Sequence, residues 1–276
     1  MNTVLVLGAT GKSGRRVAAR LRLRGVTVRA ASRSSATPFD WSDPTGWDAA
    51  LKGVDAVYVV PPNVPGPVHE FVERAQAAGV ERLVLLSGQG ADTWGDSTFG
   101  RDMRSAEDAV RGSALEWTVV RASNFDQNFD EELWHAPLVA GELALPAGDV
   151  PEPFVDLEDV ADVAAAVLTE PGRHAERIHE LTGPRALTFA EAVEVISRTS
   201  GLPMTYRRIS PAEYAADLVG QGLDADVARD LAEMYVIMER GVIAETTDGV
   251  ADVLGRPPRA FEEYALRTAA TGAWNR

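Results

Sequence analysis

The chain of 276 residues is long enough for one large α/β domain or for a domain with a small appendage. Its net charge of −14 argues against nucleic acid or an anionic membrane as the main partner, and the absence of cysteine excludes disulfides and thiolate chemistry. The opening MNTVLVLGATG has no basic region and no long apolar run, so we expect no signal peptide, no membrane span and a cytoplasmic protein.

A glycine-rich loop separates the first predicted strand from the first predicted helix. The apolar run TVLVLG (3–8) predicts a buried parallel strand, residues 14–24 predict a helix, and GATGKSG connects them. Gly8 permits the sharp turn, Gly11 lets the backbone approach a pyrophosphate, and Gly14 lets the helix pack on the strand. Because a second strand (26–31) follows, we predict dinucleotide binding here. The loop residues of this site are Gly8, Thr10, Gly11, Lys12, Ser13 and Gly14.

The amino-terminal segment is basic although the whole chain is acidic. Residues 1–39 contain no Asp or Glu but carry a series of Lys and Arg side chains. Such a basic pole suits a small, multiply charged anion, whereas a solvated helix face explains Arg20, Arg22 and Arg24.

The end of the second strand indicates which dinucleotide is bound. An NAD site usually has Asp or Glu here for the ribose 2′-hydroxyl, and an NADP site offers Arg. This strand runs into Ser32 and Arg33, with no carboxylate before Asp40. Arg33 can bind a 2′-phosphate in bidentate fashion and Ser32 can donate to it, so we predict NADP(H) as the cofactor.

Strands and helices continue to alternate after this point. Strands are predicted at 55–60, 82–87 and 115–121, with helices at 67–78 and 101–112 between them. This alternation with short connections is typical of a doubly wound parallel (Rossmann) sheet in the α/β class, which binds ligands over the carboxyl ends of its strands. The residues expected there are Pro61, Pro62, Ser87, Ala122, Asn124 and Phe125.

Several motifs occur in order along most of the chain: GATGKSGRRV, VYVVPP, LVLLSGQGA, AExxxxxSALEWTVVRASNFDQN and PFVDLEDVADVAAAVL. Together they resemble the NmrA-like family of atypical short-chain dehydrogenases/reductases, including bacterial and fungal reductases of natural-product pathways. The resemblance implies an NADP-binding Rossmann domain at 1–150, to which 158–185 return. It also implies a smaller, mixed and mostly helical lobe at 186–276, with the substrate in the cleft between them.

The catalytic residues implied by the extended dehydrogenases of this type are incomplete. That resemblance implies a Ser after the strand and a Tyr-x-x-x-Lys pair on the next helix, where the Tyr protonates the substrate. Ser87 falls at the serine position, but Phe99 and Met103 stand at the tyrosine and lysine positions, and neither can transfer a proton. The resemblance still implies that Met103 lies beside the nicotinamide ribose.

Three interpretations remain open. In the first, the protein is a reductase whose substrate accepts hydride with little help from a proton donor, such as an iminium ion, an activated enone or a quinone-like ketone. It is a reductase with a different acid, for which His135 is the candidate, whereas Asp126 more simply forms a solvated acidic face with Asp130, Glu131 and Glu132. Alternatively, it is a non-catalytic NADP(H)-binding sensor, as the resemblance also permits.

An enzyme is favoured because the cofactor loop is intact and residues 123–138 are rich in Trp and Phe. We predict an NADPH-dependent reductase of an apolar, ring-containing small molecule, acting as a monomer or homodimer and binding no metal. The residues predicted to line the substrate pocket are Gln89, Phe125, Asn128, Trp134 and Tyr235.

Overall fold

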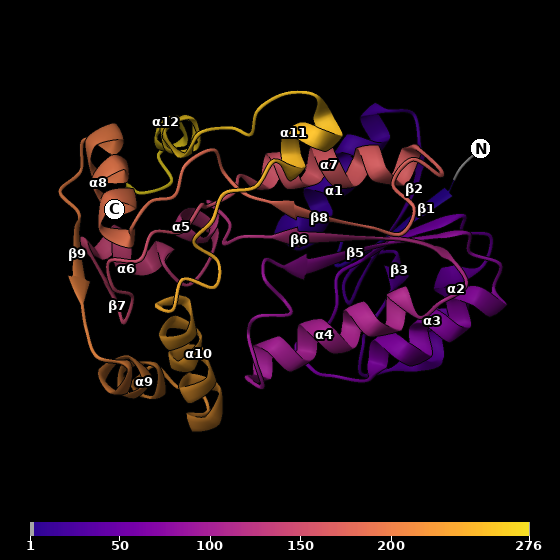
Figure 1. Ribbon diagram of the computed structural model, residues 1–276, viewed down its shortest axis with the longest axis horizontal. Helices are drawn as coiled ribbons and strands as arrows, with labels where there is room; N and C mark the ends of the chain where they lie inside the picture. Colours follow the sequence, from indigo (N-terminus) through magenta and orange to yellow (C-terminus); the bar gives the residue numbers. More distant parts are fainter. Residues whose placement is uncertain (1–2, 276) are drawn as a thin grey trace.

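A parallel sheet forms the larger part of the protein, seen here in a computed structural model that describes residues 3–275 (Figure 1). Its strands are β1 (Thr3–Leu7), β2 (Thr27–Ser32), β3 (Thr37–Pro38), β4 (Ala56–Val59), β5 (Arg82–Gly88), β6 (Glu116–Ala122) and β8 (Arg177–Leu181). They run in the order β3-β2-β1-β4-β5-β6-β8, and all neighbours are parallel. The order reverses between β1 and β4, which opens a crevice at the carboxyl ends. The predicted doubly wound sheet is confirmed.

Helices cover both faces of this sheet because alternate strand residues point to opposite sides. Val4 and Val6 pack toward α1 and α7, whereas Leu5 and Leu7 pack toward α2, α3 and α4. Figure 1 shows α1, α7 and α11 above the sheet and α2, α3 and α4 below it. Their bounds are α1 (Lys12–Leu23), α2 (Trp47–Leu51, after the 3₁₀ turn Pro44–Gly46), α3 (Pro67–Ala77), α4 (Thr98–Arg111), α7 (Leu157–Thr169) and α11 (Gly249–Leu254).

Helix α4 begins earlier than the sequence pattern predicts. Its first residue is Thr98 rather than residue 101, because Ser97 is the N-cap and its Oγ accepts a hydrogen bond from the Gly100 N–H at 3.1 Å. The extra turn brings Phe99 into the helix, so that Phe99 and Met103 lie one turn apart on the same face.

The smaller lobe is built around a two-stranded parallel sheet and a set of aromatic rings. Phe129, Phe154, Phe189 and Phe261 pack on one another with ring centroids 5.2–6.2 Å apart. Because β7 pairs with β9, residues 128–145 contribute to this lobe although they precede the expected boundary at residue 150. Its elements are α5 (Asn128–Glu131), α6 (His135–Ala140), β7 (Glu142–Leu145), α8 (Phe189–Ser200), β9 (Thr205–Arg208), α9 (Pro211–Gly220), α10 (Ala225–Met238) and α12 (Phe261–Thr271).

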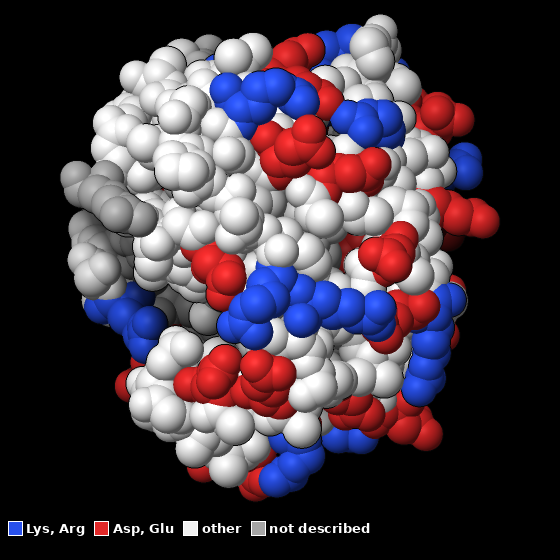
Figure 2. Space-filling view, turned by 90° about the vertical axis from the view of Figure 1, so that its left-hand side faces the viewer, with Lys and Arg blue, Asp and Glu red and all other residues white. Residues whose placement is uncertain are grey.

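The outer face of this lobe carries acidic and basic side chains interspersed with one another (Figure 2). In β9, Arg207 pairs with Glu142 at 2.9 Å and Arg208 with Glu239 at 2.6 Å. Among residues 3–275, no helix combines the length and the apolar composition that crossing a bilayer requires.

The basic pole expected at the amino terminus is largely neutralised by ion pairs. Arg16 pairs with Glu131 at 2.6 Å and with Glu158 at 2.8 Å, and Arg20 pairs with Asp162 at 2.6 Å. The side chains of α1 are therefore held against α5 and α7. The expectation that the basic pole receives a small anion was wrong for Arg16, and the expectation of a solvated helix face was wrong for Arg20, because sequence alone does not show which acids fold back onto the helix.

The expectation of a solvated acidic face was also wrong for Asp126. This residue is fully buried where the chain passes from β6 into the lobe, and neither carboxylate oxygen has a hydrogen-bond partner within the described residues. Burial raises the pKa of Asp126 well above its usual range, Asp156 and Asp159 raise it further, and Arg267 acts in the opposite direction. The protonated carboxyl is thus the form that this position favours.

We expect Asp126→Asn to stabilise the protein at neutral and higher pH. A carboxyl whose pKa is higher in the folded state than in the unfolded chain, where it is about 4, costs stability as the pH rises from that value through the folded pKa. The variant should therefore unfold at a temperature a few degrees higher than the wild type at about pH 8, with the difference shrinking toward about pH 4. Thermal unfolding measured across this range checks the prediction, and the exposed Asp217→Asn is the control. A pH-independent difference would contradict it.

Candidate functional site

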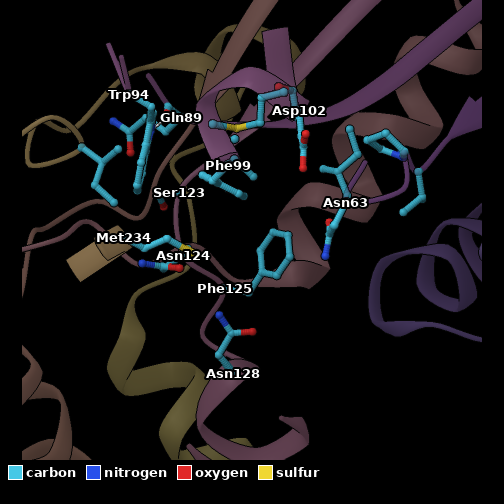
Figure 3. Close-up of a pocket in the computed structure, with 18 of the residues that line it drawn as sticks. Asn63, Gln89, Trp94, Phe99, Asp102, Ser123, Asn124, Phe125, Asn128 and Met234 are labelled. Atoms are coloured by element: carbon cyan, nitrogen blue, oxygen red, sulfur yellow. Dashed lines mark hydrogen bonds between the residues drawn. The ribbon is translucent and has the colours of Figure 1, made fainter. Parts of the chain in front are cut away.

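A cavity of about 290 Å³ lies at the carboxyl ends of β4, β5 and β6, between α4 and α10 (Figure 3). Most of its wall is apolar, and amide side chains supply much of the polar surface. It is lined by Lys12, Val60, Pro61, Pro62, Asn63, Leu86, Ser87, Gly88, Gln89, Trp94, Phe99, Asp102, Met103, Ala122, Ser123, Asn124, Phe125, Asn128, Met234, Met238 and Ile243. The cavity has the position and the character expected of a ligand site in a doubly wound sheet.

Most residues predicted at the strand ends reach this cavity. The predicted cofactor residues in its wall are Lys12, Pro61, Pro62, Ser87, Met103, Ala122, Asn124 and Phe125, and the predicted substrate residues are Gln89, Phe125 and Asn128. Trp134 and Tyr235 instead line an adjoining cavity of about 100 Å³, where the Trp134 indole N–H donates to the Tyr235 hydroxyl at 3.0 Å. Asn124 and Asn128 border both cavities.

The glycine loop is closed so tightly that no side chain fits at its end. A Cβ atom on Gly14 would lie 2.3 Å from the carbonyl oxygen of Gly8, and Gly8 itself has a φ of +61°. No side chain caps α1, whose N-cap is Gly11, so the first N–H groups of the helix remain available to an anion. This arrangement fits a pyrophosphate, which Lys12 and Ser13 would hold through backbone N–H groups, because the Gly11 N–H donates to the Gly8 carbonyl at 2.8 Å.

Lys12 brings a positive charge to the edge of the same cavity. Its Nζ donates to the Asn128 Oδ1 at 2.5 Å, lies 3.5 Å from the Glu132 carboxylate and stands 5.6 Å from the centre of the Phe125 ring. Burial lowers the pKa of Lys12, and the nearby Glu132 opposes that effect. A phosphate group beside Lys12 would favour its charged form.

Arg33 is exposed directly after the end of β2, outside the cavity. The structure assigns it no ion pair among the described residues, and Asp40 is the acidic group whose charge it influences. Beside it, the buried Ser32 accepts a hydrogen bond from the Ser34 N–H at 3.3 Å. Arg33 is therefore free to bind an anion at the predicted ribose position.

The hydroxyl of Ser87 is engaged by a buried ion pair that the sequence did not reveal. Ser87 Oγ donates to Glu107 Oε1 at 2.7 Å, and Glu107 receives two hydrogen bonds from Arg121, at 2.9 and 2.8 Å. Glu107 and Arg121 are both buried. Ser87 lines the cavity, but its proton points toward Glu107, so a catalytic hydroxyl donor at this position remains a prediction that the geometry does not favour.

The two positions that would carry a tyrosine and a lysine both face the cavity. Phe99 packs edge-on against Trp94 with ring centroids 4.9 Å apart, and Met103 lies so close to β5 that a Cβ atom on Gly88 would meet its sulfur at 2.5 Å. The wall next to the expected nicotinamide position is therefore apolar at these two residues.

The expectation that His135 lies near the cleft was wrong. His135 begins α6, and its Nε2 lies 2.8 Å from the backbone carbonyl of Ala273, outside both cavities. The carboxyl-terminal segment folds against this helix, a long-range contact that the sequence pattern did not indicate. We therefore do not retain His135 as a proton donor.

Sequence reasoning missed two acidic groups in or behind the wall. Asp102 on α4 lines the cavity, and Glu152 is buried behind it, where its Oε2 accepts a hydrogen bond from the Asn124 Nδ2 at 2.6 Å. Burial raises the pKa of Glu152 to about 8, so this carboxyl binds a proton at neutral pH and positions Asn124. Asp102 follows Phe99 by three residues, and this spacing could have placed both residues on one helix face from the sequence alone.

Comparison with known proteins agrees with this geometry. Residues 8–171 match the model of a family described as NAD(P)H-binding. The chain is 35% identical to the (4-alkanoyl-5-oxo-2,5-dihydrofuran-3-yl)methyl phosphate reductase of Streptomyces griseus over 96% of its own length and 98% of that protein.

Two solved structures share the fold. The NADPH-dependent quinone oxidoreductase QOR2 of Escherichia coli, complexed with NADPH, matches with a TM-score of 0.81 at 25% identity, covering 96% of this chain and 99% of that one. NmrA, a negative transcriptional regulator in complex with NAD, matches with a TM-score of 0.73 at 18% identity, covering 99% of this chain and 96% of that one.

We expect Gly14→Ala to weaken nucleotide binding at least about tenfold and to destabilise the fold by about 1–3 kcal/mol, because the new methyl group displaces the Gly8 carbonyl. Calorimetric titration with NADPH and thermal unfolding measure the two effects. Gly220→Ala is the matched control, since a Cβ atom there meets open space. Unchanged NADPH affinity in Gly14→Ala would show that the loop does not hold the pyrophosphate.

Proposed function

The chain belongs to the NAD(P)H-binding, NmrA-like family of atypical short-chain dehydrogenases/reductases, and we propose that it is an NADPH-dependent reductase of an apolar, ring-containing carbonyl, enone or iminium compound that works without a Tyr-Lys pair. The observation that supports this best is the cavity at the strand ends, with Phe99 and Met103 in its wall. The likeness over nearly the whole chain to a named reductase and to an NADPH-dependent quinone oxidoreductase supports an NAD(P)H oxidoreductase. The substrate class and the absence of a proton relay are the parts that we propose.

Different residues along the cavity would bind different parts of the cofactor and the substrate. The glycine loop and Lys12 would hold the pyrophosphate, and Arg33 the 2′-phosphate. The bound cofactor would supply a hydride, which carries both electrons of the reduction. Phe99, Trp94 and Met234 offer apolar contact to a substrate ring, and they exclude water from the site of reduction.

A substrate that accepts hydride without simultaneous protonation explains the missing dyad. Activated enones, quinone-like ketones and iminium ions are electrophilic enough that holding the donor and the acceptor in contact supplies much of the rate. The Streptomyces griseus relative acts, by its name, on a ring-containing oxo-dihydrofuran compound, which supports a substrate of this type.

A non-catalytic sensor is supported less well. If the protein only reported nucleotide binding, side chains would be expected to fill the space beside the nicotinamide. The cavity instead continues past the predicted cofactor residues to Gln89, Trp94 and Met234, and this extension supports a substrate site. Titration with NADPH and NADH, followed by a screen of cyclic ketones, enones and iminium salts for NADPH oxidation, tests the proposal. Nucleotide binding without oxidation by any of these acceptors would favour the sensor.

We expect Arg33→Ala to lower NADPH affinity by about 10–100-fold and to leave NADH affinity unchanged, because only NADPH carries the phosphate that Arg33 would bind. Parallel titrations with the two nucleotides measure the preference. Arg22→Ala, another exposed basic position near the amino terminus, is the control. A variant that still prefers NADPH would remove Arg33 from the site.

We expect the double variant Phe99→Tyr/Met103→Lys not to raise turnover, since the hydride-transfer step consumes no proton in the proposed reaction. The wild type should accordingly show a solvent deuterium isotope effect close to one, together with a clear isotope effect from deuterated NADPH. Steady-state rates in H₂O and D₂O provide the measurement. Faster turnover in the double variant would indicate that the protein has lost a proton relay that its substrate needs.

A further inference from the structure

Asp102 is placed in the wall of the cavity by the helical register of α4. It follows Phe99 by three residues, so these two side chains lie on neighbouring positions of one helix face, and both line the cavity together with Met103. Figure 3 shows its carboxylate pointing from α4 into the open space, next to Phe99. A helix face that in related dehydrogenases carries a phenol and an ammonium group here carries a carboxylate.

This carboxylate is the one negative charge among the described residues that line the cavity. Among the described lining residues, Lys12 and Asp102 are the charged ones, and Lys12 lies in the glycine loop, bonded to Asn128. Figure 3 places Asn128 and Asp102 at opposite ends of the cavity. The two charges therefore serve different parts of a bound complex.

No hydrogen bond or ion pair holds the Asp102 carboxylate among residues 3–275. The charged groups that act on it are Arg101, on its own helix, and Asp230, on α10. The Arg101 guanidinium is engaged elsewhere, with the backbone carbonyl of Asp96 and the hydroxyl of Thr98. Partial burial raises the pKa of Asp102, Asp230 raises it further, and Arg101 opposes the rise.

Aromatic rings and thioethers make up much of the rest of the cavity wall. Trp94 and Phe99 pack edge to face, and Met234 from α10 completes the wall. Electron-rich ring faces attract cations, and a carboxylate beside them adds a direct charge interaction. A cation would neutralise this partly buried carboxylate, whereas a neutral ketone would leave it with solvent as its partner.

Resting on the reductase function above, we propose that Asp102 is the counter-ion for a cationic hydride acceptor, and that the substrate is a ring-containing iminium ion rather than a neutral ketone or enone. Hydride addition to the carbon of the C=N⁺ bond forms one C–H bond, and the π electrons become a lone pair on nitrogen. The product is a neutral amine, the reduced nicotinamide is the electron donor and is oxidised, and no proton is taken up or released. Because this reaction takes up no proton, it needs no proton donor, and this agrees with the presence of Phe99 and Met103 in the cavity wall.

The test compares two ligands of the same shape and different charge. Wild-type protein saturated with tetrahydro-NADPH, a reduced analogue that donates no hydride, is titrated calorimetrically with N-methylquinolinium and with 1-methylnaphthalene. We expect the cation to bind at least about tenfold more tightly than the neutral compound. Asp102→Asn should lose about tenfold in affinity for the cation and change its affinity for the hydrocarbon less than about twofold.

Two variants control for side effects of the substitution. Asp102→Glu keeps the charge and should keep the preference for the cation, and Asp108→Asn, exposed on the same helix, should leave both affinities unchanged. Equal affinity of the wild type for the two ligands, or equal loss of both in Asp102→Asn, would overturn the proposal.

Two further outcomes separate this inference from the proposed function. If Asp102→Asn weakens NADP⁺ binding but leaves the affinity for N-methylquinolinium unchanged, the carboxylate acts on the oxidised cofactor and the inference is overturned. A wild-type protein that takes up no pyridine nucleotide would overturn the reductase function itself. Nucleotide uptake without any preference for the cation would overturn only the role of Asp102.

Discussion

The buried pair of Glu107 and Arg121 fixes the wall on which the site depends. Glu107 lies on α4 and Arg121 on β6, and their two hydrogen bonds, with a third from Ser87 on β5, tie the helix to two strands of the sheet. Removing one partner of such a pair leaves a buried charge and costs about 3–5 kcal/mol. The register of α4, and with it the placement of Phe99, Asp102 and Met103, follows from this anchor.

The opposite wall of the cavity comes from the smaller lobe, whose chain leaves the sheet after β6. After β6 the chain passes through the buried Asp126, builds part of the smaller lobe, and re-enters the sheet with α7 and β8. Helix α10 of that lobe brings Met234 and Met238 to the cavity. The cavity therefore depends on how the lobe is seated on the sheet, and thioether side chains at this boundary adapt readily to ring-shaped ligands.

The sequence was sufficient for the sheet and for the glycine loop between β1 and α1. Gly8, Gly11 and Gly14 mark a local turn whose geometry follows from a few adjacent residues, and parallel strands bring their carboxyl ends together by topology alone. The failures were long-range. Nothing near His135 indicates that its ring meets the carbonyl of Ala273, and nothing near Asp126 indicates that the lobe closes over it.

The role proposed for Asp102 explains how the loss of the tyrosine and the lysine is compatible with reduction. A tyrosine and a lysine on α4 would assist a substrate that becomes an anion when it accepts hydride, because the new negative charge must be protonated. A substrate that begins as a cation becomes neutral instead, and it gains nothing from an acid at the carbon being reduced. What it needs before the reaction is a partner for its charge, and desolvation strengthens that attraction. On α4, Phe99 and Met103 replace the phenol and the ammonium group, and Asp102 adds a carboxylate nearby. This helix would therefore bind a substrate that is positively charged before the reaction, rather than protonate one that becomes negatively charged during it.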